Sequence, residues 1–353
     1  MKTNREPTPA QLDFDKPRAS KECSPKNRML HVDMSFPVVV NFDLTDNGMC
    51  DLPQFFWDDA SNFVENGRLM VPALFKDLPT FYFTGVGDIK YDSAPVQVTN
   101  GAAFTVKDIR HELAKLWLEK GGGGGTDIEN LCESYEMMAY WLVNRFEMDA
   151  KRIQNSVCIF VADEAMRPNL DKAELDYYFG GTNAPTTAAV LFEQLRKKFN
   201  ENVFLIFRPS FDAKKNAAIM AHWQEMLSEN KIVVLPRNRL ITTAIQETIR
   251  IALGATSTAE VQKQLNELAA TMPLPKREKS EPATENQSNP IFKNPLPEAP
   301  FADSSQTTIG VNKPLRKPRP SDDWRLQPKT KERPARSTSR KRKTPAEADA
   351  FRL

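Results

Sequence analysis

Oxygen-bearing side chains alternate along one short stretch of the chain, directly after an apolar run. Asp43, Thr45 and Asn47 follow residues 38–42 at alternate positions. A carboxylate, a hydroxyl and an amide oxygen are donors that suit a hard cation such as Mg²⁺. Asp and Asn are also common turn residues, so the same stretch fits a strand that runs into a turn. The pattern therefore indicates either a metal site or an Asx-type turn.

Two further polar residues occupy comparable places in the sequence. Thr126 follows a run of glycines, residues 121–125, and Asp163 comes just after the apolar run 157–161. In open α/β sheets, ligands bind beyond the carboxyl ends of the parallel strands. If these strands are parallel, we expect Asp43, Thr126 and Asp163 to meet at one edge of the sheet.

The elements that must position these residues alternate in type between residues 35 and 255. Short apolar runs rich in β-branched and aromatic residues are typical of strands buried on both faces. Between these runs, apolar residues recur with helical spacing. The alternation predicts an α/β fold, with a doubly wound, mostly parallel sheet that is Rossmann-like and has helices on both faces. Strands are expected at residues 38–42, 80–84, 96–98, 157–161, 203–207 and 232–235, and helices at 106–117, 129–146, 191–199, 219–227 and 241–252, with short helices within 51–79.

The two ends of the 353-residue chain differ in composition from this central part. Residues 1–34 form a polar, proline-containing lead-in, and residues 271–353 form a tail rich in proline, lysine and arginine. Such segments bury too little apolar surface to offset the loss of chain entropy, so both are predicted to be disordered. One domain is therefore expected at residues 35–255, followed by a short helix at 256–270.

The placement of the cysteines and the lack of long apolar segments indicate in which compartment the protein resides. The four cysteines are scattered and form no CxxC pair, which is typical of a reducing compartment. No secretory signal is visible at the start of the sequence, and no apolar run is as long as a membrane span. From these patterns we expect a soluble, cytoplasmic protein that does not insert into membranes.

The order and spacing of the polar motifs resemble the von Willebrand factor type A (VWA) domain and its metal-ion-dependent adhesion site. That family carries Asp-x-Ser-x-Ser after the first strand, Thr after a glycine turn, and Asp after the fourth strand. Asp43, Thr45 and Asn47 stand at the first motif, Thr126 at the second and Asp163 at the third. Thr45 keeps the hydroxyl of a serine, whereas Asn47 replaces the second serine with an amide. The site therefore resembles a degenerate version of the family motif.

The likeness covers about residues 35–255, and several residues resemble a microbial branch of the family. These residues are Gly85, Gly87, Asp88, Asp92, Pro95, Gln97, Gly123, Gly124 and Gly125, followed by Glu133, Ser134, Tyr135 and Glu136. The resemblance implies a non-enzymatic protein-interaction module. It also implies that Asp43, Thr45, Asn47, Thr126 and Asp163 hold a Mg²⁺ or Mn²⁺ ion, with an open position that accepts a carboxylate from a partner protein.

Four other acidic residues have simpler interpretations. Asp88 and Asp92 lie in a glycine-containing link, where a solvent-facing turn is favoured over a second acidic site. Glu133 and Glu136 are expected at the start of a helix, in surface or capping roles. The sequence thus assigns none of these four side chains to chemistry.

Two competing function classes fit parts of the sequence. Asp43 at a strand end resembles the nucleophile of haloacid-dehalogenase-like phosphatases, in which an Asp attacks phosphorus beside Mg²⁺. That family has a second Asp two residues later, where this chain has Thr45, and no convincing lysine motif is found. The other alternative is a nucleic-acid-associated scaffold, because the basic residues of 271–353 would make salt-dependent phosphate contacts. A P-loop and a zinc protease are not predicted, since neither Gly-Lys-Ser/Thr nor a full HExxH motif is present.

Overall fold

The computed structural model describes much of the chain between residues 23 and 273. The described residues are 23–33, 36–45, 49, 51–70, 80–90, 92, 94–99, 101–103, 105–116, 132–149 and 153–273. Two residues of the predicted metal site, Asn47 and Thr126, lie outside this set. Asp43, Thr45 and Asp163 lie within it.

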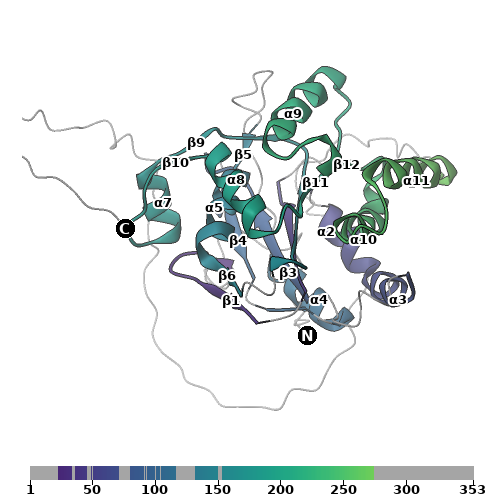
Figure 1. The fold of residues 1–353 in the computed structure, drawn as a ribbon, viewed down its shortest axis with the longest axis horizontal. Helices are drawn as coiled ribbons and strands as arrows, with labels where there is room; N and C mark the ends of the chain where they lie inside the picture. Colours follow the sequence, from purple (N-terminus) through teal and green to yellow (C-terminus); the bar gives the residue numbers. More distant parts are fainter. Residues whose placement is uncertain are drawn as a thin grey trace, which may run out of the picture. The chain divides into compact units, whose positions relative to one another are not determined.

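A six-stranded sheet forms the centre of the fold (Figure 1). In the order β12-β11-β7-β2-β3-β4, all neighbouring strands are parallel except β4, which runs antiparallel to β3. The strands are β2 (Pro37–Asp43), β3 (Thr80–Val86), β4 (Val96–Val98), β7 (Val157–Ala162), β11 (Val203–Phe207) and β12 (Ile232–Val234). The chain first builds the sheet outward from β2 through β3 to β4, and then continues on the other side of β2 with β7, β11 and β12. This change of direction between β2 and β7 is the mark of a doubly wound fold. The predicted fold class is confirmed.

The central strands are apolar throughout because both faces of the sheet are covered. Every residue of β2, β3, β7 and β11 is buried. Since successive side chains point to opposite faces, Val38 and Val40 pack into one core and Val39 into the other. This accounts for the unbroken apolar runs that the sequence shows at these strands.

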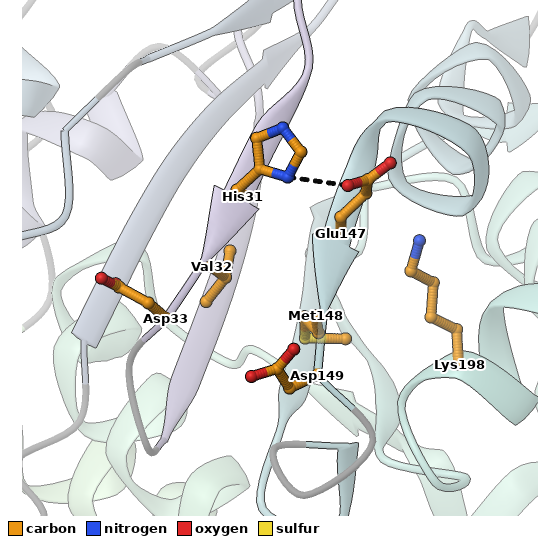
Figure 2. A pocket seen from close by; sticks show the side chains of 7 residues that line it. All are labelled: His31, Val32, Asp33, Glu147, Met148, Asp149 and Lys198. Atoms are coloured by element: carbon orange, nitrogen blue, oxygen red, sulfur yellow. Dashed lines mark ion pairs between the residues drawn. The ribbon is translucent and has the colours of Figure 1, made fainter.

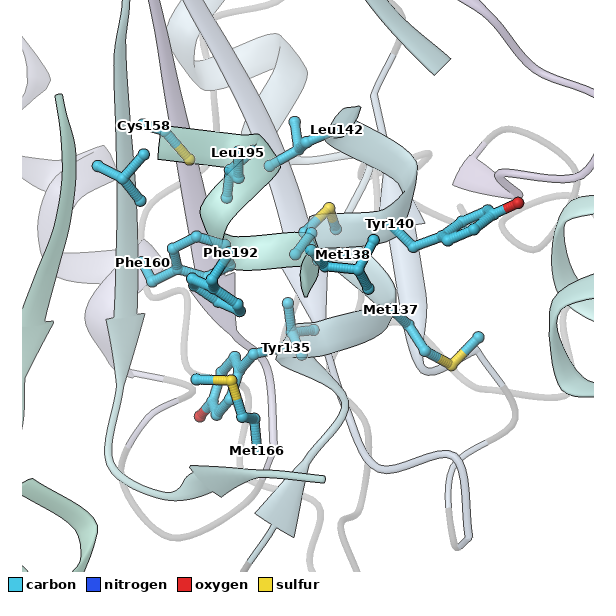
Figure 3. Close-up of a cluster of buried hydrophobic side chains, with 14 of the residues drawn as sticks. Tyr135, Met137, Met138, Tyr140, Leu142, Cys158, Phe160, Met166, Phe192 and Leu195 are labelled. Carbon is cyan, nitrogen blue, oxygen red and sulfur yellow. The ribbon is translucent and has the colours of Figure 1, made fainter. Parts of the chain in front are cut away.

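Helices cover each face of this sheet (Figure 1). One core is closed by α2 (Asp51–Asp58), α3 (Ala60–Met70), α4 (Val106–Leu113), α10 (Ile241–Ala252) and α11 (Thr258–Thr271). The other is closed by α5 (Tyr135–Arg145), α7 (Lys172–Phe179), α8 (Ala188–Lys198) and α9 (Ala213–Met226). Figure 3 shows the second core, in which Tyr135 and Met138 of α5 lie close to Phe160 of β7 and Phe192 of α8. No helix in the described part of the chain has the length and apolar character needed to cross a membrane.

Short strands outside the main sheet depart from the sequence-based expectations. β1 (Leu30–Val32) pairs in parallel with β6 (Phe146–Met148), although residues 1–34 were expected to be disordered. β5 (Cys132–Glu133) pairs in parallel with β8 (Ala165–Met166), where a helix was expected to run through residues 129–146. The helix instead begins at Tyr135, and Phe146 already belongs to β6. These two- and three-residue strands are too short to show a period of two. A further short pair joins β9 (Asn169–Leu170) to β10 (Thr186–Thr187) in antiparallel fashion.

Asn41 is a buried polar residue that connects the three central strands. Its Nδ2 donates to the carbonyl oxygen of Ile159 in β7 at 2.9 Å, and its Oδ1 accepts from the hydroxyl of Thr84 in β3 at 2.6 Å. We expect Asn41→Ala to lower the free energy of unfolding by about 1–3 kcal/mol, because it leaves the buried Thr84 hydroxyl without its acceptor. Urea unfolding at fixed pH measures this loss.

The matched control removes both partners at similar volume. The double variant Asn41→Leu/Thr84→Val has no orphaned hydroxyl, so it should lose less stability than the sum of its two single variants. Strictly additive losses would show that the Asn41–Thr84 hydrogen bond does not couple β2 to β3.

Candidate metal centre

Two acidic residues of the predicted site lie at the point where the sheet reverses its winding. Asp43 is the last residue of β2, and Asp163 follows directly after β7. The two strands are parallel neighbours, with Phe42 opposite Val161, so both carboxylates leave the sheet at the same edge. Asp43 is fully buried and Asp163 is 9% exposed. The structure therefore brings these two residues together at the place where doubly wound folds bind ligands.

Asp43 is held by three hydrogen bonds from two residues. Its Oδ1 accepts from the backbone N–H of Thr45 at 2.9 Å and from the Thr45 hydroxyl at 2.6 Å. Its Oδ2 accepts from the hydroxyl of Tyr135, the first residue of α5, at 2.5 Å. The bond from residue 45 to residue 43 is the Asx-type turn that the sequence allowed. Tyr135 was expected only as a core residue, and its ring does pack against Trp223 with centroids 5.3 Å apart.

Asp163 is held by a positive side chain from the next strand. Nη1 of Arg208 lies 3.2 Å from Oδ2 of Asp163. Arg208 follows β11, where its backbone N–H donates to the carbonyl oxygen of Ala162 and its Nε donates to Asn238. The sequence showed only that an arginine closes a strand. That it faces Asp163 depends on the strand order, which sequence patterns alone do not reveal.

Burial makes negative charge costly at this edge. It raises the pKa of Asp43 to about 8, and repulsion by Asp163 adds to this, although the hydrogen bonds from Thr45 and Tyr135 oppose it. Burial also raises the pKa of Asp163 to about 6, helped by Glu164 and opposed by Arg208. Carboxylates that are disfavoured in this way are stabilised by a nearby cation.

Further acidic residues surround these two. Glu133 is 4% exposed, and its pKa is raised well above the ordinary value, first by burial and then by repulsion from Asp43. Glu164 forms an ion pair with Lys215 at 3.0 Å. Asp88 is buried in its turn, where its backbone N–H donates to Oδ2 of Asp92 at 2.6 Å. Asp92 is also buried.

Three expectations about these acidic residues are therefore corrected. Asp88 and Asp92 do form a turn, but they are buried and do not face solvent. Glu133 lies in β5, ahead of the helix. Glu136 is in the first turn of α5 but is fully buried, where it pairs with Arg167 at 2.8 Å. The charges of both glutamates suggested surface positions, which the packing of β5 and α5 prevents.

The donors of the described residues fit a hard cation only in part. Within the described ranges, no three His, Cys, Asp or Glu side chains come together as a metal cluster. Asp43, Thr45 and Asp163 provide oxygen donors, which are the type that Mg²⁺ and Mn²⁺ prefer. Additional donors would have to come from hydroxyls, water, or the loops that carry Asn47 and Thr126. This donor set is compatible with a cation that keeps several waters.

An open pocket of about 450 Å³ lies apart from the predicted site residues, beside the β1–β6 pair. Figure 2 shows its side chains, among which Nδ1 of His31 lies 2.7 Å from Oε2 of Glu147. Lys198 donates to the carbonyl oxygen of Val143 at 2.7 Å, and burial lowers its pKa to about 8. None of the predicted site residues lines this pocket, and it gives no support to the metal site.

Comparison with known proteins gives similarity at the level of the fold. No family model matches the sequence, and no curated protein matches it. Solved structures that resemble the chain include proximal thread matrix protein 1 from the mussel byssus, at 14% identity and a TM-score of 0.36, over 63% of this chain and 49% of that one. A second is the vWF domain of the pili tip protein Mfa5 from Porphyromonas gingivalis, with 9% identity and a TM-score of 0.37, over 64% of this chain and 97% of that one. A third is von Willebrand factor type A from Catenulispora acidiphila, with 8% identity and a TM-score of 0.33, over 67% of this chain and 51% of that one. The chain has a doubly wound α/β fold.

The similarity to these proteins is partial in length. The chain spans about half the length of the mussel protein and about a third of a pilus adhesin, SpaC from Lactobacillus rhamnosus GG. One structure of the mussel protein has a zinc-occupied MIDAS motif. In this chain, Asp43 and Asp163 occupy the ends of adjacent strands, β2 and β7.

The raised pKa of Asp43 has a consequence for stability without divalent cations. In the unfolded chain Asp43 ionises near pH 3.8, whereas in the folded chain it keeps its proton until about pH 8. We therefore expect the free energy of unfolding, measured in chelator, to fall as the pH rises between these values. Asp43→Asn should reduce this fall by up to about 4 kcal/mol between pH 5 and pH 8, since one pKa unit corresponds to about 1.4 kcal/mol.

The measurement is chemical unfolding at both pH values, with Glu193→Gln as the control. Glu193 is an exposed carboxylate on α8 whose pKa is lowered by its hydrogen bond from Lys197, so its removal should not flatten the pH dependence. An unchanged pH dependence in Asp43→Asn would contradict the assignment of a buried, proton-retaining carboxyl to Asp43.

Proposed function

We propose that this VWA-like domain is a protein-interaction module that binds a divalent cation, Mg²⁺ or Mn²⁺, between the ends of β2 and β7. Asp43, Thr45 and Asp163 would hold the ion, together with Asn47 and Thr126 from loops outside the described residues. The observation that carries the proposal is the position of two buried carboxylates, Asp43 and Asp163, at the edge where the sheet reverses its winding.

The residues of the chain divide the work at this site. Asp43 supplies charge, and its hydrogen bonds from Thr45 and Tyr135 fix the direction of its carboxylate. The Thr45 hydroxyl gives its hydrogen to Asp43, so its lone pairs remain available as acceptors. Asp163 adds a second carboxylate, which Arg208 partly neutralises. The bound ion would offer an open position to a carboxylate of a partner protein, because Mg²⁺ keeps exchangeable waters.

The surroundings of Asp43 argue against the phosphohydrolase alternative. A nucleophilic Asp needs one carboxylate oxygen directed at the substrate. Both oxygens of Asp43 accept hydrogen bonds from Thr45 or Tyr135. The position two residues later, where that enzyme class has a second Asp, holds Thr45.

Charge supports a second, separate role for the tail. Residues 271–353 contain 18 of the 48 Lys and Arg and 10 of the 46 Asp and Glu, which gives this segment a net charge of +8. The rest of the chain then carries −6, since the total is +2. A segment with this charge would bind nucleic acid through phosphate contacts that weaken steeply with salt.

Calorimetry with Mg²⁺ and Mn²⁺ tests the cation site directly. We expect saturable binding by the wild type and loss of that binding in Asp43→Ala, because the variant removes the buried carboxylate at the centre of the site. Glu193→Gln, which removes an exposed carboxylate on α8, should bind as the wild type does. Equal, negligible heats for the wild type and Asp43→Ala would reject the metal site.

A pull-down in Mg²⁺ and in chelator tests the interaction role. The partner should be retained by the wild type in Mg²⁺, and it should be lost in chelator and in Asp43→Ala. Retention that does not depend on either condition would place the interaction surface elsewhere on the protein.

For the tail, salt-sensitive DNA binding should disappear when residues 271–353 are deleted.

A further inference from the structure

The strand β12 forms one outer edge of the six-stranded sheet. Among the described residues, β11 is the only strand that pairs with β12, so the other side of β12 faces away from the sheet. A strand edge of this kind carries outward N–H and C=O groups that can pair with a strand of another molecule. What contacts these groups therefore decides whether the sheet can be extended by a further strand.

Gln262 of α11 contacts this edge in the way that a neighbouring strand would. Its Oε1 accepts from the backbone N–H of Val234 at 2.8 Å, and its Nε2 donates to the carbonyl oxygen of the same residue at 3.0 Å. The N–H of Leu235, one residue later, donates to the carbonyl oxygen of Phe207 in β11 at 2.7 Å. Because successive N–H groups of a strand point to opposite sides, the N–H of Val234 faces away from β11. The side-chain amide thus offers β12 the donor and the acceptor that an added strand would offer.

Short contacts before β12 close the rest of this edge. The N–H of Ile232, which points to the same side as that of Val234, donates to the carbonyl oxygen of Glu229 in the preceding 3₁₀ turn. The hydroxyl of Thr258, the first residue of α11, donates to the carbonyl oxygen of Asn230 at 2.5 Å. The two outward-facing N–H groups of β12 are therefore both bonded within the chain.

The helix α11 is held at this edge by a narrow apolar stripe. It contacts both α10 and β12 (Figure 1). Its first turn is stabilised by a capping box, in which Ser257 and Glu260 accept from each other's backbone N–H. The buried residues of the stripe are spaced four apart and belong to the core that α10 closes; they are Val261, Leu265 and Ala269. Docking of this stripe is what places Gln262 against β12.

We propose that α11 covers the outer edge of β12 and keeps this edge from pairing with β12 of a second copy of the chain. Ile232, Val233 and Val234 are all β-branched, which favours an extended strand. Two copies of one edge can pair in antiparallel fashion about a two-fold axis, because such an interface uses the same surface of both molecules. The proposed cation plays no part at this edge.

Hydrogen exchange of the full-length protein, followed by nuclear magnetic resonance, tests the cover at one amide. Gln262→Ala keeps a residue that favours helix but removes the side-chain amide that contacts Val234. We expect the Val234 N–H to exchange about tenfold faster than in the wild type, or faster still. The Leu235 N–H, which donates to β11, should exchange as before.

The matched variant for this measurement is Gln262→Glu. It keeps a side-chain oxygen that can accept from the Val234 N–H, so it should retain more of the protection than Gln262→Ala does. Equal exchange of the Val234 N–H in the wild type and Gln262→Ala would overturn the proposal.

Displacing the whole helix tests the consequence for association. Val261→Asp/Leu265→Asp puts two charges on the stripe that holds α11 and so uncovers β12. In sedimentation velocity, this variant should dimerise at concentrations where the wild type is a monomer. Adding Val234→Pro removes an N–H that points away from β11, so it should return the uncovered variant to the monomer.

Two results of the association test would contradict the proposal. One is an uncovered variant that folds and stays monomeric. The other is association that survives Val234→Pro, because it would come from exposed apolar surface and not from strand pairing. If circular dichroism shows that the charged variant does not fold, the exchange rates in Gln262→Ala and Gln262→Glu decide.

Discussion

The parallel pairing of β2 with β7 is the constraint on which the rest of the site depends. Its register, from Val38 opposite Val157 to Phe42 opposite Val161, brings the carboxyl ends of both strands to one edge. A shift of one residue would turn every side chain of β2 to the opposite face. Asn41 opposes such a shift, because its hydrogen bonds to β7 and β3 form only in this register. The same pairing therefore fixes the core and aligns Asp43 with Asp163.

The cost of this alignment is a concentration of buried carboxylates that the fold compensates unevenly. Asp163 and Glu164 each have a positive partner that comes from or follows β11, namely Arg208 and Lys215. Asp43 is compensated by hydrogen bonds alone, which are weaker than a full counter-charge against burial. A buried carboxylate normally has a positive side chain as its partner, so a buried carboxylate with hydrogen bonds alone is unusual. When the electrostatic cost of buried carboxylates is concentrated at one edge of an otherwise well-packed sheet, that edge is a candidate binding site.

The main sheet could be predicted from the sequence because its strands are buried on both faces, which makes them continuous apolar runs. Asp43 and Asp163 could be placed at one edge for the same reason, once the strands were taken as parallel. Glu133 could not, because β5 has only two residues and leaves no periodic signal. Arg208 could not, because its contact with Asp163 follows from the adjacency of β7 and β11, which is a property of the whole chain.

The turn at the end of β2 and the proposed cation site are parts of one arrangement. In the turn, the Thr45 hydroxyl donates its only hydrogen to Asp43, so that what it presents outward is its lone pairs. A hydroxyl that donates to a carboxylate is polarised, which makes its oxygen a better donor to a cation. The Asx-type turn would therefore prepare Thr45 for the proposed ion and would not compete with that role. A pattern that suits an ordinary turn can therefore also mark a metal site. Which of the two it marks depends on the residues that the fold brings next to the turn from distant parts of the chain.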